Sequence, residues 1–462
     1  MPSFGPSTSL SSADLVIKYG RVAVSSSLRS CAVAAKDGRI TWMGANSNAP
    51  NADRVINASG LIILPGVIDV HVHMRDPGAT YKEDFRSGTS AAAAGGVATV
   101  FDMPNNTPPT KDVAALRLKA KAAEEKAIVD YALYGLMTEG NIGELVPLLR
   151  AGVIGFKCYM AETTGNLASP SESEMLGEMG VIARAGLRAA VHAEDDSLLQ
   201  ERVSRLKREG RVDALAHYES RPEKVEEKAV RRALALAREA KCDLHIAHLS
   251  SAAGANEVKR AKMSTRRAQG SVTAETCPQY LLLDRGDYAE KGSLMKSNPS
   301  VKRRADKLAL WRAVRDGTID MIATDHAPHT LEEKTSGASI FDRASGFPGL
   351  ETSVALMLTC VSRGLLSLSR YVQLTSEGPA KAWRLYPKKG RIRVGSDADF
   401  TIVDTKVEWR IDPAKFVSKA KYSPFDGFEA KGAAVYTIVR GNVVMDHGHL
   451  DSRSRGEMQR PI

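Results

Sequence analysis

Short apolar segments alternate with longer segments of helical period through the middle of the chain. The helical segments, such as 112–126 and 224–240, are rich in Ala, Leu, Glu, Lys and Arg, which favour helices. Eight apolar segments resemble buried strands: 61–71, 98–103, 128–136, 153–159, 187–192, 242–248, 271–276 and 319–324. Eight strand–helix repeats predict an α/β fold, a (β/α)8 TIM barrel, in which functional groups follow the carboxyl ends of the strands.

The two ends of the chain have a different pattern, with short alternating segments and turn signals. These segments are 15–20 and 32–40 near the amino end, and 395–403 and 436–444 near the carboxyl end. We therefore expect one small β-sandwich built from both chain termini. The predicted division assigns 1–61 and 384–462 to the sandwich and tail, and 62–383 to the barrel. The tail from Asp446 onward has no core pattern, so we expect it to be extended or disordered.

Composition and charge narrow the class of protein. The chain has 462 residues and is 43% hydrophobic, with no apolar run as long as a membrane span and no secretory signal. We therefore expect a cytoplasmic protein without a membrane partner. Its formal charge of +10 comes from dispersed Lys and Arg without interleaved aromatic residues, so we expect no nucleic-acid partner. The five cysteines contain no Cys-x-x-Cys pair, which argues against a disulfide framework or a zinc finger.

The first predicted barrel strand ends in two histidines, His71 and His73, two residues apart. Because side chains alternate along a strand, both imidazoles would point to one face and could reach one metal ion. Taken alone, the pair fits chance as well as a metal site. A second pair, His447 and His449, lies in a polar, glycine-containing tail, where we expect a solvated loop.

The ends of other predicted strands carry further candidate ligands. His192 ends the fifth strand, His248 ends the sixth, and Asp325 follows the eighth. Because these ends meet at one barrel mouth, the imidazoles and the carboxylate predict a site for zinc-like metals, and two ions become plausible. Lys157 lies at the end of the fourth strand. Burial could lower its pKa until it forms a bridging carbamate with carbon dioxide, although a structural or substrate-binding lysine is the commoner case.

These motifs resemble those of the cyclic amidohydrolases of the amidohydrolase superfamily, and most of all those of the dihydroorotases. The resemblance runs from 64–69 to 423–425, and its most specific motifs are HVHMRDPG, MPNNTPP, GFKCYM, HAED, ATDHAPHTLEEK and SGFPGLET. It implies two zinc ions, bridged by an N6-carboxylated Lys157. The other metal ligands that it implies are His71, His73, His192, His248 and Asp325. Asp325 would also be the catalytic proton shuttle.

The resemblance also implies contacts to the substrate. Arg75 and Asn105 match the positions that hold the carboxylate of dihydroorotate, a group suited to a planar cation and an amide donor. The further substrate contacts that it implies are Asn298, His329, Ser345 and Gly346. Thr163 and Thr164 could form a clamp over the substrate, but an ordinary polar loop explains them equally well. The expected partner is a small cyclic amide with a carboxylate, and the expected assembly is a homo-oligomer, a dimer or a tetramer.

We therefore expect the reversible hydrolysis of (S)-dihydroorotate to N-carbamoyl-L-aspartate, a step of pyrimidine (UMP) biosynthesis. Three features depart from the dihydroorotase pattern: Cys158 and residues 277–280 are commoner among allantoinases and hydantoinases, and 300–302 replaces a usual Pro-Leu-Arg. An allantoinase, or another cyclic amidohydrolase such as a hydantoinase, is therefore the alternative. A non-catalytic assembly partner is a further alternative, and it would bind no zinc.

Overall fold

A barrel of parallel strands forms the centre of the molecule. The computed structural model describes residues 12–24, 27–161, 167, 169–264 and 270–462. The barrel strands follow one another in chain order around one eight-stranded sheet. They are β8 (Val67–Val72), β9 (Val97–Asp102), β10 (Asp130–Met137), β11 (Gly155–Tyr159), β12 (Arg188–His192), β13 (Asp243–Ile246), β14 (Val272–Thr276) and β15 (Met321–Ile322). A parallel bridge between Val72 and His326 brings the two edges together, so the predicted (β/α)8 barrel is confirmed.

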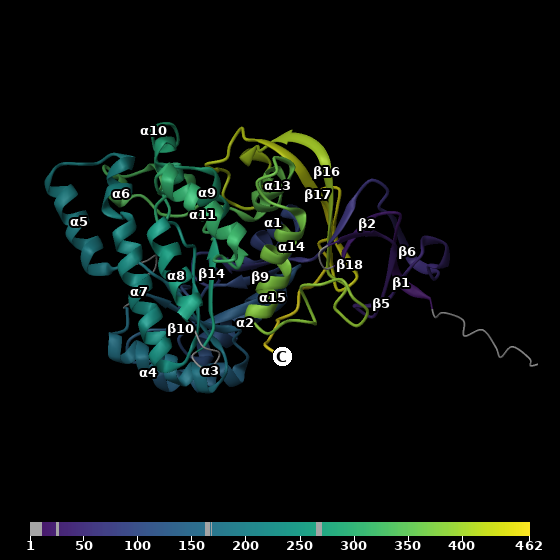
Figure 1. Cartoon of the computed structure of the whole chain (residues 1–462), viewed down its shortest axis with the longest axis horizontal. Helices are drawn as coiled ribbons and strands as arrows, with labels where there is room; N and C mark the ends of the chain where they lie inside the picture. The colour runs from purple at the N-terminus through teal and green to yellow at the C-terminus, as the bar shows by residue number, and fades with distance from the viewer. Residues whose placement is uncertain (1–11, 25–26, 162–166, 168, 265–269) are drawn as a thin grey trace, which may run out of the picture.

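Helices cover the outside of this barrel (Figure 1). They are α1 (Phe85–Gly95), α2 (Val113–Lys126), α3 (Leu145–Ala151), α4 (Glu172–Arg184), α5 (Asp196–Arg208), α6 (Ala214–Ser220), α7 (Glu223–Ala240), α8 (Ala252–Ser264), α9 (Pro278–Leu282), α10 (Tyr288–Lys291), α11 (Arg304–Asp316), α12 (Leu331–Thr335), α13 (Leu350–Ser362), α14 (Leu368–Val372) and α15 (Gly378–Ala382). Capping boxes begin several of them, with Asp84 at α1 and Ser171 at α4. Among the described residues, no helix combines the length and apolarity needed to cross a membrane.

Two further sheets lie beside the barrel, next to α13 and α14 in Figure 1. The four-stranded sheet has the order β5-β4-β1-β6. Its strands are β1 (Ala13–Lys18), β4 (Ala32–Lys36), β5 (Arg39–Gly44) and β6 (Ala52–Asn57). The seven-stranded sheet has the order β19-β18-β17-β16-β7-β2-β3. Its strands are β2 (Arg21–Val24), β3 (Ser27–Ser30), β7 (Ile62–Pro65), β16 (Phe400–Arg410), β17 (Glu429–Val439), β18 (Asn442–Asp446) and β19 (His449–Leu450).

Both ends of the chain contribute to this seven-stranded sheet. β7 pairs with β2 in parallel on one side and with β16 in antiparallel on the other. Side chains from the two sheets share one apolar core, which includes Leu15, Ile17, Ile63, Phe400 and Ile438. The predicted β-sandwich from both termini is therefore confirmed. The predicted domain boundaries at residues 61 and 383 stay a prediction.

The strand predicted over 61–71 is wrong in one respect, because it is two strands in two sheets. β7 belongs to the terminal sheet and β8 to the barrel, with Gly66 between them. A Cβ atom at Gly66 would lie only 2.7 Å from Cβ of Asp399, so the chain passes from one sheet to the other where only glycine fits. The apolar run hid this break because both strands are buried on both faces.

The carboxyl-terminal tail is extended, as expected, but the alternative of disorder is wrong. The main-chain N–H of Gln459 donates to the carbonyl oxygen of Tyr131 at 2.6 Å, and its side-chain amide donates to Asp130 at 2.9 Å. The tail therefore continues along β10 through polar contacts, which a search for apolar periodicity does not detect. His447 and His449 are both exposed, as predicted, but only His447 lies in a turn, since His449 begins the short strand β19.

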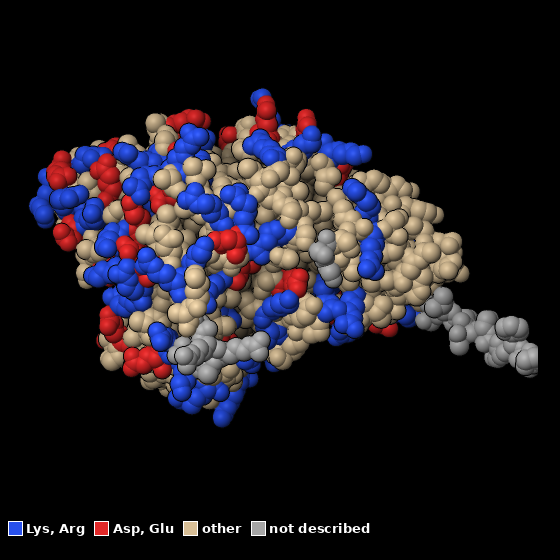
Figure 2. All heavy atoms as spheres, viewed as in Figure 1, with Lys and Arg blue, Asp and Glu red and all other residues tan. Residues whose placement is uncertain are grey.

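Charged side chains are spread over the surface. On the face in Figure 2, Lys and Arg lie over the barrel helices with Asp and Glu among them, whereas the end formed by the terminal sheets carries few charges. The dispersal of basic residues along the chain is therefore matched by their dispersal over this face.

A buried lysine joins the barrel to the terminal sheets. Lys389 Nζ lies 2.7 Å from Asp130 Oδ2, 2.5 Å from Asp399 Oδ2 and 3.2 Å from Asp397 Oδ2. Burial opposes the charge on Lys389, but the three carboxylates raise its pKa above the usual value. The three aspartates are close enough together to hold a cation, and the ammonium group supplies it.

Replacing this lysine by an apolar residue should destabilise the fold in a pH-dependent way. We expect Lys389→Met to lower the free energy of unfolding by about 3–5 kcal/mol at neutral pH, because the buried Asp399 loses its ion-pair partner while Asp130 keeps Arg440 and Asp397 keeps Lys388. Mutual repulsion would then raise the folded-state pKa values of these carboxylates above their unfolded values. The deficit should therefore grow as pH rises and shrink toward about pH 4.

Urea unfolding of the wild type and the variant across this pH range measures the effect. The control is Lys381→Met, which removes an exposed ion pair with Glu377 and should cost about 1 kcal/mol or less. Equal unfolding midpoints for the two variants would contradict the role of Lys389.

Candidate active site

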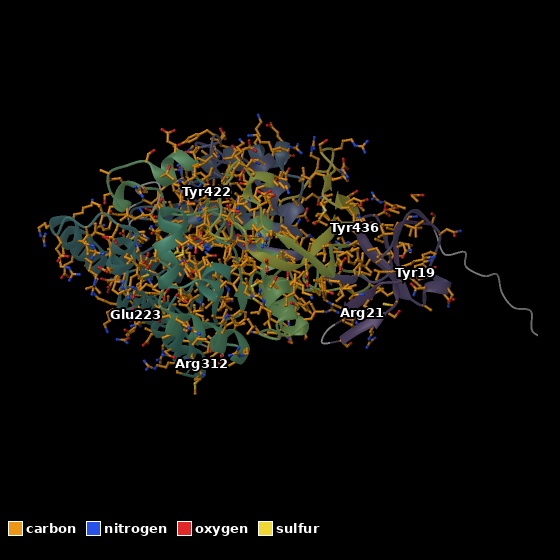
Figure 3. All side chains as sticks on the ribbon, turned by 90° about the horizontal axis from the view of Figure 1, so that it is seen from above. Tyr19, Arg21, Glu223, Arg312, Tyr422 and Tyr436 are labelled. Atoms are coloured by element: carbon orange, nitrogen blue, oxygen red, sulfur yellow. The ribbon has the colours of Figure 1, made fainter. Side chains whose placement is uncertain are left out.

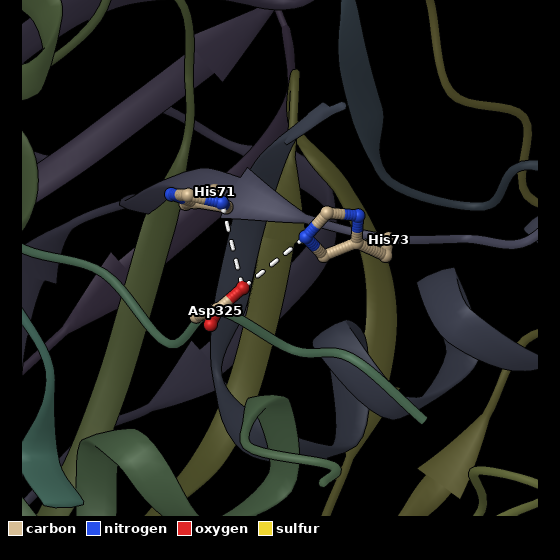
Figure 4. A group of neighbouring side chains, drawn as sticks. All are labelled: His71, His73 and Asp325. Atoms are coloured by element: carbon tan, nitrogen blue, oxygen red, sulfur yellow. Dashed lines mark hydrogen bonds and ion pairs between the residues drawn. The ribbon is translucent and has the colours of Figure 1, made fainter. Parts of the chain in front are cut away.

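Two histidines and an aspartate meet at the carboxyl ends of β8 and β15. Figure 4 shows both imidazole rings facing one oxygen of Asp325, with His71 Nε2 at 3.4 Å and His73 Nε2 at 3.2 Å from its Oδ1. One donor atom from each residue lies within 4.8 Å of the other two, so this group could hold a metal ion. All three side chains are buried. The structure therefore brings together the residues predicted for the first metal.

The other predicted ligands form a second group beside the first. His192 Nδ1 lies 3.0 Å from His248 Nε2, and the ring centroids of His71 and His248 are 5.0 Å apart. Lys157 is buried near them, and its Nζ has no hydrogen-bond partner among the described residues. Burial lowers its pKa to about 8 and so favours the neutral amine, the form that reacts with carbon dioxide. A buried amine without a hydrogen-bond partner, close enough to affect the pKa values of both His248 and Asp325, fits a bridged pair of cations.

Burial also sets the protonation states of these ligands. It lowers the pKa of His73 to about 3 and moves the pKa values of His192 and His248 below the usual value. Burial alone would raise the pKa of Asp325, but His71 and His73 beside it hold that pKa below its usual value. At neutral pH His73, His192 and His248 therefore present neutral nitrogens and Asp325 presents an anionic oxygen, as metal binding requires.

The backbone at the site is strained at three of the predicted positions. Arg75, His248 and Asp325 have φ angles of 58°, 34° and 50°, in the left-handed region that side-chain-bearing residues rarely adopt. Each of these residues follows the carboxyl end of a barrel strand, so the left-handed backbone changes the direction of its side chain at the mouth of the barrel. Strain of this kind concentrates at functional sites.

A buried glutamate that the sequence reasoning missed fixes one ligand of each group. Glu275 Oε1 lies 2.5 Å from His71 Nδ1 and accepts the main-chain N–H of His248 at 3.0 Å, while its Oε2 lies 3.0 Å from His245 Nε2. Burial opposes ionisation of Glu275, but His71 and His245 together lower its pKa. The only signal in the sequence was a carboxylate next to the end of the seventh predicted strand. His245, on β13, is buried.

Other polar residues orient two more of the rings. His192 Nε2 lies 3.0 Å from Glu194 Oε2, and Arg221 donates a hydrogen bond to the same oxygen. His73 Nδ1 lies 2.7 Å from Asn105 Oδ1, so Asn105 contacts a metal-ligand candidate as well as the predicted substrate side. Such contacts on the far nitrogen of a metal-binding imidazole fix its tautomer and its direction.

A small cavity of about 30 Å³ lies directly over the candidate ligands. Its lining contains most of the predicted site residues: His71, His73, Arg75, Asn105, Tyr159, His192, His248, Asn298, Asp325, Ala327, Ser345 and Gly346. Tyr159 is an addition to the predicted set. Its hydroxyl group and the Oδ1 atom of Asn298 are buried, and neither has a hydrogen-bond partner among the described residues. Both atoms are therefore available to a polar substrate in this cavity.

Arg75 connects the cavity to His329. The guanidinium donates through Nε to the carbonyl oxygen of Pro328 at 3.1 Å, and its Nη2 lies 3.2 Å from His329 Nε2. His329 Nε2 also lies 3.0 Å from the carbonyl oxygen of Ser345. All the predicted substrate contacts except His329 and the threonine pair thus line one cavity, and His329 contacts two of the residues in that lining. Thr163 and Thr164 lie outside the described residues.

Two residues outside the lining of this cavity, Lys334 and Tyr422, make hydrogen bonds to the main chain of the segments around it. Lys334 Nζ donates to the carbonyl oxygens of Lys296 at 2.9 Å and Ala344 at 3.0 Å, which joins the segments that carry Asn298 and Ser345. Tyr422, between β16 and β17, accepts the main-chain N–H of His329 at 3.2 Å. Figure 3 shows Tyr422 over the barrel, far from Tyr19 in the terminal sheets.

The sequence of this chain is similar to those of known proteins over most of its length. The model of the amidohydrolase family matches residues 62–444. The chain belongs to the amidohydrolase family. A dihydroorotase from Methanosarcina acetivorans is 39% identical over 451 residues, which cover 96% of this chain and 95% of the relative. An allantoinase from Solibacter usitatus is 37% identical over 97% of both chains.

A solved structure agrees with this assignment. The L-hydantoinase (dihydropyrimidinase) from Arthrobacter aurescens has a TM-score of 0.93 at 35% identity, covering 97% of this chain and 100% of that one. The predicted resemblance and the predicted enzyme class, a cyclic amide hydrolase, are therefore confirmed. The three relatives carry the names of different enzymes at similar identity, so sequence identity alone does not distinguish between their substrates.

Neutralising the buried glutamate should weaken metal binding by this amidohydrolase. We expect Glu275→Gln to lower metal affinity by about 10- to 100-fold, because a residue that orients a metal ligand contributes about that much. Metal content after dialysis against a graded chelator series measures the change. Glu257→Gln on α8 is the control, since Glu257 pairs with Arg231 and Arg260 on the outside of the barrel. Unchanged metal retention in Glu275→Gln would contradict this role.

Proposed function

We propose that this amidohydrolase is a dihydroorotase, which hydrolyses (S)-dihydroorotate reversibly to N-carbamoyl-L-aspartate. The observation that carries this proposal is the Arg75 guanidinium at the cavity over the candidate metal ligands. Arg75 is only 7% exposed, and no described carboxylate lies within ion-pair distance of it. A buried cation without an anionic partner is costly, and a substrate carboxylate would supply that partner.

The other cavity residues suit the rest of such a substrate. Asn105 lines the cavity beside Arg75, and His329 contacts the guanidinium from behind. Asn298 Oδ1 could accept a ring N–H, and the hydroxyl of Tyr159 could donate to a ring carbonyl. A ring that carries both a carboxylate and amide groups therefore satisfies more of these atoms than an uncharged ring does.

We propose two zinc ions for the metal site, with carboxylated Lys157 as their bridge. His71, His73 and Asp325 would hold the first ion, and His192 and His248 the second. Bound zinc would lower the pKa of a water molecule and polarise the amide carbonyl. Asp325, anionic at neutral pH, would accept the proton of the attacking water and return it to the leaving ring nitrogen. Pyrimidine biosynthesis and a homo-oligomer, a dimer or tetramer, belong to the same proposal.

Hydantoin hydrolysis is the second candidate function. It is favoured by the TM-score of 0.93 to the L-hydantoinase structure and by Cys158 after the bridging lysine. That substrate would not need the Arg75 guanidinium as a counter-charge. The two candidate functions therefore differ in whether turnover depends on the contact between Arg75 and a substrate carboxylate.

Dihydroorotate and dihydrouracil form a matched pair of substrates, since they differ by this carboxylate. We expect Arg75→Met to lower kcat/KM for dihydroorotate by about 100-fold or more, because hydrogen bonds to a charged group contribute about 1.5–3 kcal/mol each. The same variant should change kcat/KM for dihydrouracil and hydantoin by less than about fivefold. A wild-type enzyme that prefers hydantoin or allantoin to dihydroorotate would refute the proposal.

The bridging role of Lys157 has a separate test. We expect Lys157→Ala to lower kcat by at least about 100-fold and to reduce the zinc content per chain, because the bridging anion is lost. Acetate or propionate should restore part of the activity by occupying the space of the missing carbamate. The control is the thermal melting of the variant, which should show a folded protein. Wild-type activity in Lys157→Ala would exclude a bridging role.

A further inference from the structure

A second cavity, of about 620 Å³, lies between the terminal sheets and the barrel. This volume falls within the range of about 300–1,000 Å³ that is common for small-molecule sites. One wall comes from β2, β3 and β5, and the other from residues 372–377 and 386–393. Pro65, just before the amino end of β8, also lines it, so this cavity lies at the opposite end of that strand from His71. The two cavities share no lining residue.

The charge around this junction cavity is unbalanced. Three guanidinium groups line it, those of Arg29, Arg391 and Arg393, and no described carboxylate lies within ion-pair distance of any of them. The acidic residue of the lining, Glu377, is already paired with Lys381 at 2.5 Å. Most basic surface groups elsewhere on a protein can share nearby acidic side chains, but these three have only solvent or a ligand as counter-charge.

One of these guanidinium groups is held in place against an aromatic ring. Arg391 Nη1 donates to the hydroxyl oxygen of Tyr386 at 2.7 Å, and its Cζ lies 5.1 Å from the ring centroid. Apolar side chains complete the lining, among them Met43, Val372 and Ile392. Because Arg391 is already oriented, an anion that binds it loses less conformational entropy than one that must order a free side chain.

We propose that the junction cavity binds a small organic anion with a flat apolar body, the chemistry of a nucleoside phosphate. Guanidinium groups match phosphate oxygens in pairs, which gives the anionic end of the ligand its partners. The apolar side chains of Met43, Val372 and Ile392 would cover the flat body beside the Arg391–Tyr386 pair. A neutral ligand would leave the three cations unmatched, and a bare inorganic anion would leave the apolar wall exposed to water.

Isothermal titration calorimetry of the whole, metal-loaded enzyme with AMP tests this site. Adenosine and inorganic phosphate are the comparison probes, since each keeps one half of the AMP molecule. We expect both to bind at least about tenfold more weakly than AMP, because each satisfies only one part of the cavity. Binding of adenosine as tight as that of AMP, or no AMP binding at millimolar concentration, would overturn the proposal.

Paired substitutions locate the binding. Arg391→Gln with Arg393→Gln should weaken AMP binding at least about tenfold and leave turnover of the cyclic amide unchanged. The matched control is Arg312→Gln with Arg315→Gln on α11, which removes the same charge from an exposed helix surface; Arg312 is labelled in Figure 3. If the first double variant does not fold, Arg29→Gln tests the same cavity from an exposed strand. Equal AMP affinity in the wild type and the cavity variants would refute the site, whatever the catalytic substrate is.

Discussion

One buried carboxylate, that of Glu275, connects three strands beside the candidate metal ligands. Its oxygens contact His71 on β8, His245 on β13 and the main chain of His248, while Glu275 itself lies on β14. A buried anion is tolerated only with such partners, and the partners include one candidate ligand from each metal group. The geometry of the ligands and the ionisation of Glu275 therefore depend on each other.

The closure of the barrel depends on a similar contact. Asp69 on β8 accepts the main-chain N–H groups of Thr324 beside β15 and of His71, and burial raises its pKa to about 7. The contact joins the first and last strands just below the point where His73 and Asp325 meet. Barrel closure and the position of Asp325 beside His73 therefore depend on the same two strand ends.

Much of this site could be predicted from the sequence because of a simple regularity. His71, His192 and Lys157 lie at the ends of apolar segments, and parallel strands bring such ends to one mouth. Glu275 and Tyr159 lie in equally clear strands, but no local pattern tells which neighbour a buried polar side chain will meet. Tyr422 could not be predicted from the sequence for another reason. It enters from the connection between two strands of the terminal sheet, and only tertiary structure brings that connection over the barrel.

The pairing of β7 with β16 has a consequence for how this protein is made. A ribosome releases the amino end first, so β2 and β7 leave it long before residues 400–410 exist. During that interval one edge of β7 has unpaired peptide groups beside an apolar face, the condition under which strands of different chains associate. The contact of Gln459 with Tyr131 forms later still. The terminal sheet therefore cannot be completed until β16 has left the ribosome, and β7 keeps an open edge until then.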